Sequence, residues 1–197
     1  MVTEIAIRLR LKPLPRSADT PQMNRFLLIF ALLLSLPASA VELFGVPLVS
    51  ADKGSLGFAV QRAGASLQKT ERNQVFEVFD SSEILDTSYR LYLGFDVQTG
   101  RFGFAEYYIR RLAHDTMLER LKDKYGEPAV TPGEFLTDQR YQWQIDGIDV
   151  SLHKARGCLC SRLLYSEPTV HEAVRQQHAQ VQKQRADEAV ESFRKAF

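Results

Sequence analysis

The 197-residue sequence contains only two cysteines and no apolar run long enough to cross a membrane as a helix. Its main apolar run, residues 26–36, has 11 residues interrupted only by Ser35, whereas a spanning helix needs roughly 20. No cysteine follows this run before Cys158, which argues against a lipoprotein anchor. The sequence also lacks a Gly-x-Ser-x-Gly motif, a His-Glu-x-x-His motif and a phosphate-binding glycine loop, so it predicts a chain that is not an enzyme.

Residues 23–40 have the pattern of a secretory signal peptide. A short positive start at Asn24-Arg25 precedes the apolar run, and the small residues Ala38-Ser39-Ala40 follow it at the cleavage positions. We expect cleavage near Ala40/Val41 and a periplasmic mature chain without a membrane span. Residues 1–22 are unusual before a signal peptide, so we interpret them as a non-native or untranslated extension.

The charges of the chain are balanced. The sequence has 25 Lys+Arg and 24 Asp+Glu; residues 1–40 hold five of the basic and two of the acidic residues, which leaves 20 against 22 and a net charge of −2 after cleavage. This balance gives no electrostatic reason to expect nucleic acid or an anionic membrane surface as a partner. The 157 residues after the leader can bury one core, so we expect one domain over residues 41–167 and a polar helix over residues 168–197.

Two segments of helical spacing, residues 51–63 and 114–125, are each followed by a glycine, Gly64 and Gly126. Ser50 is the expected N-cap of the first helix. Their apolar positions match at a constant offset of 62, and about three strands follow each helix, at residues 74–79, 89–95, 102–109, 140–145, 148–154 and 158–165. The sequence therefore predicts an α+β fold in which two α-β-β-β units form one antiparallel sheet with helices on one face.

The long C-terminal segment is polar and carries no glycine or proline after Pro168. Thr169 and Glu172 form a candidate capping box, and a sparse apolar stripe follows. We expect a surface helix that is loosely attached or seeks a partner.

Aromatic residues gather in the strands at residues 89–95 and 102–109, and Tyr92, Phe102, Phe104 and Tyr107 form a candidate binding surface. Successive side chains of a strand point to opposite faces, so the aromatics of these strands cannot all enter one core. The sequence favours a simpler alternative, in which a helix covers the second face of the sheet.

Cys158 and Cys160 share a strand face with His153 of the preceding strand. If residues 156–157 form the turn, His153 lies opposite Cys160, and the three groups have the ligand chemistry for zinc or copper. Cysteines two apart in a strand are separated by about 6.6 Å, which is the upper edge of disulfide geometry. Structural thiols, a metal or redox site and a disulfide all remain open, and the sequence favours structural thiols.

The helix ends Ala63-Gly64 and Tyr125-Gly126-Glu127-Pro128, together with the strand series from Tyr141 to Tyr165, carry a resemblance in architecture. Over about residues 50–167 the chain is similar to the β-lactamase-inhibitor-protein-like domains and to the small outer-membrane assembly lipoproteins of the SmpA/OmlA type. The resemblance implies protein binding without catalysis, and it supplies no site residue.

The sequence thus predicts an exported, non-catalytic binding or scaffolding protein of the bacterial cell envelope, with a protein partner and no cofactor. The alternative is a periplasmic metal-binding or thiol-redox protein that uses Cys158, Cys160 and His153, with zinc or copper as the metal.

Overall fold

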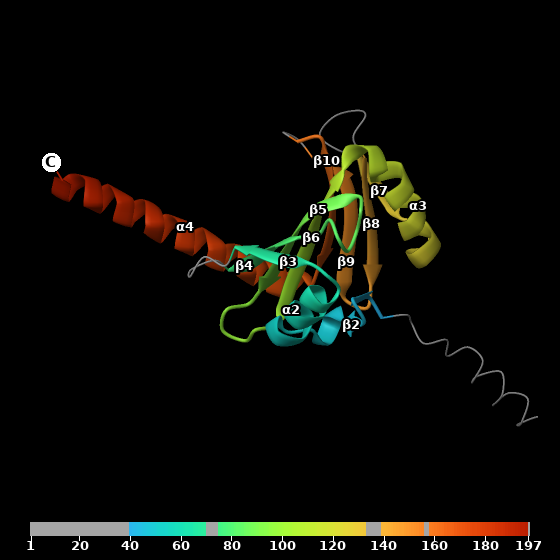
Figure 1. Cartoon of the computed structure of the whole chain (residues 1–197), viewed down its shortest axis with the longest axis horizontal. Helices are drawn as coiled ribbons and strands as arrows, with labels where there is room; N and C mark the ends of the chain where they lie inside the picture. The colour runs from blue at the N-terminus through green and yellow to red at the C-terminus, as the bar shows by residue number, and fades with distance from the viewer. Residues whose placement is uncertain (1–39, 70–74, 133–138, 156–157, 197) are drawn as a thin grey trace, which may run out of the picture. The chain divides into compact units, whose positions relative to one another are not determined.

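The computed structural model describes residues 40–69, 75–132, 139–155 and 158–196. They form an eight-stranded antiparallel sheet in the order β3-β4-β5-β6-β10-β9-β8-β7, with helices packed against it (Figure 1). The predicted extension and, except for Ala40, the predicted signal peptide lie outside the described residues. No helix in the described ranges is long and apolar enough to cross a bilayer.

Two units of the same plan make up this sheet. The first consists of α2 (Lys53–Arg62), β3 (Ser66–Lys69), β4 (Phe76–Asp80), β5 (Ser88–Phe95) and β6 (Phe102–Arg110). The second consists of α3 (His114–Tyr125), β7 (Ala129–Pro132), β8 (Gln139–Ile145), β9 (Ile148–Lys154) and β10 (Cys160–Ser166). They join where β6 pairs with β10. The predicted α+β fold is confirmed, with one more strand in each unit because the short β3 and β7 extend its outer edges.

Local sequence explains where the two helices begin and end. Gly64 and Gly126 follow them with φ angles of 109° and 82°, in the left-handed region that glycine enters without steric cost. The start of α2 differs from the prediction, since Asp52 and not Ser50 is the N-cap. The Asp52 carboxylate accepts a hydrogen bond from the Ser55 backbone N–H at 2.8 Å, whereas Ser50 ends the preceding 3-10 turn, Leu48–Ser50.

The main core lies between the sheet and the helices α2 and α3. Leu56 and Val60 of α2 and Leu118 and Leu121 of α3 are buried in one cluster with inward side chains of the central strands, among them Leu91, Leu93, Ala105, Ile109, Val150, Leu152 and Leu163. The hairpin of β1 (Glu42–Leu43) and β2 (Val46–Pro47) packs at the edge of this cluster. We call this side of the sheet the helix-covered face.

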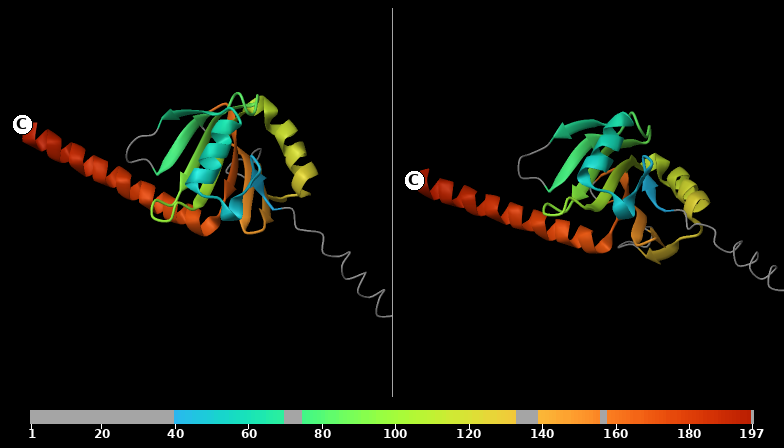
Figure 2. Two further views of the ribbon diagram at one scale, coloured as in Figure 1. Left: turned by 60° about the horizontal axis from the view of Figure 1, so that its bottom comes forward. Right: turned by 90° about the horizontal axis from the view of Figure 1, so that it is seen from below.

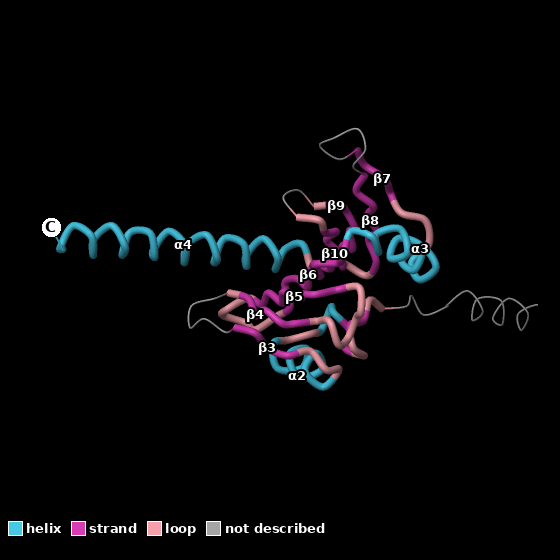
Figure 3. Tube along the Cα trace, turned by 45° about the horizontal axis from the view of Figure 1, so that its top comes forward, coloured by secondary structure: helices cyan, strands magenta, loops and turns pink. Residues whose placement is uncertain are grey.

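Helix α4 (Pro168–Ala196) packs on β5 and β6 from the opposite side, which we call the second face. Figure 3 shows α2 and α4 on opposite sides of the first unit. Val170 and Val174 are buried there against Phe76 and Phe104. The predicted capping box of Thr169 and Glu172 is wrong, because the Glu167 side chain accepts the hydrogen bond from the Val170 backbone N–H. Val190 and Phe193 are 59% and 69% exposed in the part of α4 that continues beyond the strands (Figure 2).

Candidate functional site

Strand pairing places five residues side by side across the second face. In the register of β5, β6, β10, β9 and β8, each member of the set lies directly opposite the next. We call this set the basic row; in spatial order it contains Arg90, Tyr108, Arg162, His153 and Arg140. Adjacent side chains in such a row interact directly, because their Cβ atoms are about 4.5–5.5 Å apart.

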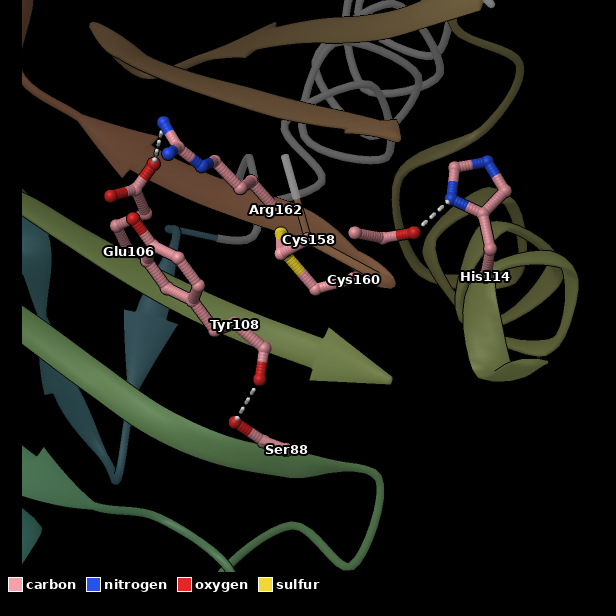
Figure 4. The surroundings of a disulfide bond; sticks show 8 residues. Ser88, Glu106, Tyr108, His114, Cys158, Cys160 and Arg162 are labelled. Carbon is pink, nitrogen blue, oxygen red and sulfur yellow. Dashed lines mark hydrogen bonds and ion pairs between the residues drawn. A yellow bond between two sulfur atoms is a disulfide. The ribbon is translucent and has the colours of Figure 1, made fainter. Parts of the chain in front are cut away.

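The centre of the basic row is held by contacts between charged and aromatic groups. The Arg162 guanidinium lies 5.0 Å from the centroid of the Tyr108 ring, within the range of a cation–π contact. Its Nη1 is 3.5 Å from a carboxylate oxygen of Glu106 (Figure 4). The Tyr108 ring is 5.3 Å from Tyr92 and 6.1 Å from Tyr89, so a tyrosine cluster continues the row along the second face.

A β-bulge in β5 directs one of these tyrosines to the second face. Tyr89 is an extra residue in β5, between the pairs Ser88↔Ile109 and Arg90↔Tyr108. Such a bulge breaks the alternation of faces, so Tyr89 reaches Tyr108 on the second face. The Ser88 hydroxyl is buried at the bulge and donates to the Tyr108 carbonyl at 3.1 Å, which fixes the backbone there (Figure 4).

Polar atoms at the middle of the row lack partners. Arg162 Nε and His153 Nδ1 are both buried and make no hydrogen bond within the described residues. A buried polar atom without a partner is costly, so such atoms need an explanation. The two atoms belong to residues that pair across β10 and β9 at the middle of the row, between the exposed Arg90 and Arg140.

The row generates a positive electrostatic environment. Burial, and then the charges of Arg140 and Arg162, lower the pKa of His153 to about 4. Burial raises the pKa of Glu106, and the nearby Arg162 partly offsets that rise. Three guanidinium groups therefore face one paired carboxylate. The neutral form of His153 is favoured first by burial and then by its cationic surroundings.

Helix α4 borders the row on one side. A cavity of about 160 Å³ lies between α4 and the sheet, lined by Phe76, Phe104, Glu106 and the two helix histidines among other residues. The His171 ring stacks 4.9 Å from Phe104, and the His178 ring 4.9 Å from Phe76. Glu106 thus links the row to the underside of α4.

The predicted aromatic binding surface is not assembled. Phe102 and Tyr107 are only 2% and 5% exposed, because both point into the core of the helix-covered face. Tyr92 and Phe104 lie on the second face, where α4 covers Phe104 and Tyr92 stays half-exposed. The preferred alternative, a helix over the second face, is what the structure shows for this part of the sheet.

The favoured interpretation of Cys158 and Cys160 as structural thiols is wrong, and so is the alternative metal set. Cys158 and Cys160 form a disulfide, with their Cα atoms 5.2 Å apart. This distance is shorter than the strand value because Cys158 precedes β10 in a bend. His153 pairs with Arg162 and not with Cys160, and the described residues contain no group of three side chains arranged to hold a metal ion. The proposed turn at residues 156–157 lies outside the described residues.

Sequence reasoning missed the arginines of the basic row. Arg90 and Arg140 are 50 positions apart, and no local motif links them. A signal was present in the alternation, which places Arg140, His153 and Arg162 on the polar side of their strands. Only the correct pairing register joins them into one row.

No protein-family model and no curated protein matches the sequence. A solved structure of a DUF4309 family protein (YjgB) from Bacillus subtilis subsp. subtilis str. 168 is similar to this chain, with 12% sequence identity and a TM-score of 0.40. The match covers 64% of this chain and 86% of that chain. A likeness of this degree carries no inference about activity.

Proposed function

We propose that the chain is an exported, non-catalytic binding or scaffolding protein of the bacterial cell envelope. The basic row and the adjoining tyrosines bind an acidic surface of a protein partner. The role is one of recognition, and it involves no chemical step.

The observation that supports this proposal best is the composition of the uncovered part of the second face. Arginine and tyrosine are enriched among the residues that dominate protein–protein binding energy. A guanidinium group also matches a carboxylate with two parallel hydrogen bonds. The exposed Arg90 and Arg140, and the Arg162 side chain, which is 38% exposed, offer such donors along one line.

Two further features support a location outside the cytoplasm. Residues 23–40 have the pattern of a signal peptide. The Cys158–Cys160 disulfide fits an oxidising compartment, because cytosolic thiols are mostly kept reduced.

The proposal is tested by photo-crosslinking in the native host. A photoreactive amino acid in place of Tyr92 lies beside the row. The same photoreactive amino acid in place of Phe58, which is 69% exposed on α2, reports on a distant surface. We expect a discrete protein adduct from position 92 and none from position 58. High salt should weaken the adduct, since exposed charge pairs are screened.

Charge variants then decide whether the row is responsible. Arg90→Gln combined with Arg140→Gln removes two exposed charges at the ends of the row, and the adduct should fall about tenfold. The matched control, Arg62→Gln with Lys183→Gln, removes the same charge from other exposed positions and should leave the adduct unchanged. An adduct equally strong in both double variants would rule out the basic row as the binding site.

A thiol-redox protein is the second candidate, and the disulfide favours it. Cys158 is half-exposed and therefore accessible to another thiol, whereas Cys160 is 1% exposed. Equilibration with reduced and oxidised glutathione distinguishes the two functions. The disulfide of a redox protein would be partly reduced at the redox potential of the cell envelope, whereas we expect the disulfide of a binding protein to stay oxidised.

A further inference from the structure

We infer that the helix-covered face contains a binding site for an amphipathic carboxylate with a single alkyl chain, such as a medium-chain fatty acid. The site is an apolar cavity of about 260 Å³, on the opposite side of the sheet from the basic row. It lies over the junction of the two units, where β6 and β10 meet, and α3 forms one of its walls. The inference does not depend on the proposed protein partner.

The walls of this cavity suit an alkyl chain. Aliphatic side chains from β1, the β4–β5 connection, α3 and β10 line it, namely Leu43, Ile84, Leu85, Met117, Leu121 and Leu163. Tyr107 and Tyr165 also contribute to the lining, and both are 5% exposed. Apolar groups gain free energy when they leave water for such a lining, and this gain is not directional.

The hairpin at one wall adopts a backbone that its sequence disfavours. Phe44 and Gly45 have φ angles of 56° and 76°, which is the two-residue turn that normally takes asparagine or glycine at its first position. A bulky side chain at positive φ is uncommon and unfavourable. Phe44 nevertheless occupies this position, and it is one of the residues that line the cavity.

Two basic residues at the edge of the cavity, which we call the rim, also break a local sequence preference, that against like charges four residues apart in a helix. Arg120 and Lys124 are four residues apart on α3, so they lie next to each other and repel. Glu119 and Glu127 both pair with Lys122, and in the described ranges neither Arg120 nor Lys124 forms an ion pair. Both basic residues line the same cavity, so an anionic head group would be attracted to this rim.

These observations converge on one ligand. Residues that break local sequence preferences often mark functional sites. Here two such departures border the same apolar cavity: the positive φ of Phe44, and the like charges of Arg120 and Lys124. The lining accepts the alkyl chain, and the rim selects a negative head group over a neutral or positive one. We therefore assign the carboxylate to Arg120 and Lys124 and the chain to the cavity.

Titration with a matched set of probes tests this site. Octanoate, decanoate, decanol and decylamine are added below their micelle concentrations to the protein purified from its host, and the heat of binding is recorded. Each added methylene that enters the cavity should tighten binding by about fourfold, so decanoate should bind about 15-fold more tightly than octanoate. Decanoate should also bind more tightly than decanol, and decylamine most weakly.

Two variants separate the rim from the walls. Arg120→Gln with Lys124→Gln should weaken decanoate by about tenfold and leave decanol unchanged, because only the charge is lost. Phe44→Gly should weaken decanoate and decanol alike. The control Arg62→Gln with Lys183→Gln should change neither ligand.

Three outcomes would overturn the inference. They are no binding of decanoate, equal binding of decanoate, decanol and decylamine by the wild-type protein, and affinities that neither variant alters. Equal binding would indicate non-selective adsorption of alkyl chains.

Discussion

The same substitution, glycine to alanine, should have opposite effects at two positions of the first unit. Gly94 in β5 lies opposite Phe104 in β6, and the Phe104 ring covers it. An added Cβ at Gly94 would overlap three atoms of that ring, including Cζ at 2.8 Å. Movement of the ring away from an added methyl group would disturb its stacking against His171 of α4, at 4.9 Å.

The expected magnitude at Gly94 is the balance of two terms. Alanine in place of glycine favours the folded strand by about 0.5–1 kcal/mol, because an unfolded chain with alanine has less conformational freedom to lose on folding than one with glycine. Forcing an extra methyl group into a packed cluster costs about 1–3 kcal/mol. Gly94→Ala should therefore lower the free energy of unfolding by about 1–2 kcal/mol, and the loss should concentrate where Phe104 supports α4.

Gly57 in α2 provides the control. A Cβ there would lie 3.7 Å from Glu77 Oε2, which is an ordinary van der Waals contact. Alanine is preferred over glycine by about 1 kcal/mol in a helix interior, so Gly57→Ala should stabilise the protein by that amount.

Urea denaturation at neutral pH measures both changes, and amide hydrogen exchange locates them. In Gly94→Ala the first half of α4 should exchange faster, and in Gly57→Ala its exchange should be unchanged or slower. A Gly94→Ala protein as stable as the wild type, with unchanged exchange in α4, would refute the reasoning that Phe104 holds the helix on the sheet.

Three further predictions concern the protein as a whole. The pKa of His153 is about 4 in the folded protein and near 6.5 in the unfolded chain, so the unfolded chain binds a proton first and stability falls as the pH drops from about 6.5 to 4. His153→Gln should remove about 1–2 kcal/mol of that loss, after allowance for solvent screening. Identical pH profiles of urea unfolding for the variant and the wild type would contradict this. Reduction of the Cys158–Cys160 disulfide should lower the free energy of unfolding by only about 1.5 kcal/mol, because the loop that it closes is very short, and unfolding upon reduction would show a larger structural role. Mass spectrometry of the exported protein should find Val41 as its first residue, and a retained residue 23 would contradict cleavage.

Much of the fold could be predicted because its signals are local. The hairpin of β5 and β6 and the helix α3 lie where alternation and helical spacing place them, and Gly64 and Gly126 mark equivalent helix ends. The outer strands β3 and β7 escaped prediction for a physical reason. Each has four residues at an edge of the sheet, and β7 is exposed along its whole length, so no apolar alternation reveals it.

The candidate site could not be predicted, because alternation specifies the face of a residue but not its neighbour. A shift of two residues between β9 and β10 leaves every side chain on the same face. The sequence therefore correctly placed Leu152 and Leu163 on one face and His153 on the other, yet it paired His153 with Cys160. The true register puts Arg162 opposite His153, which changes the expected chemistry from a metal site to a cationic row.

Both proposed sites lie where elements outside the repeat meet it. Each unit contains one helix and four strands, and both helices pack into one core on the helix-covered face. The β1–β2 hairpin has no counterpart among the described elements of the second unit, and it supplies Leu43 and Phe44 to the apolar cavity. On the other side, α4 covers part of the second face, and among the described strands its main contacts are with β5 and β6. A repeat that only needed to fold would require neither addition, so these additions are the parts of the chain in which we expect function to reside.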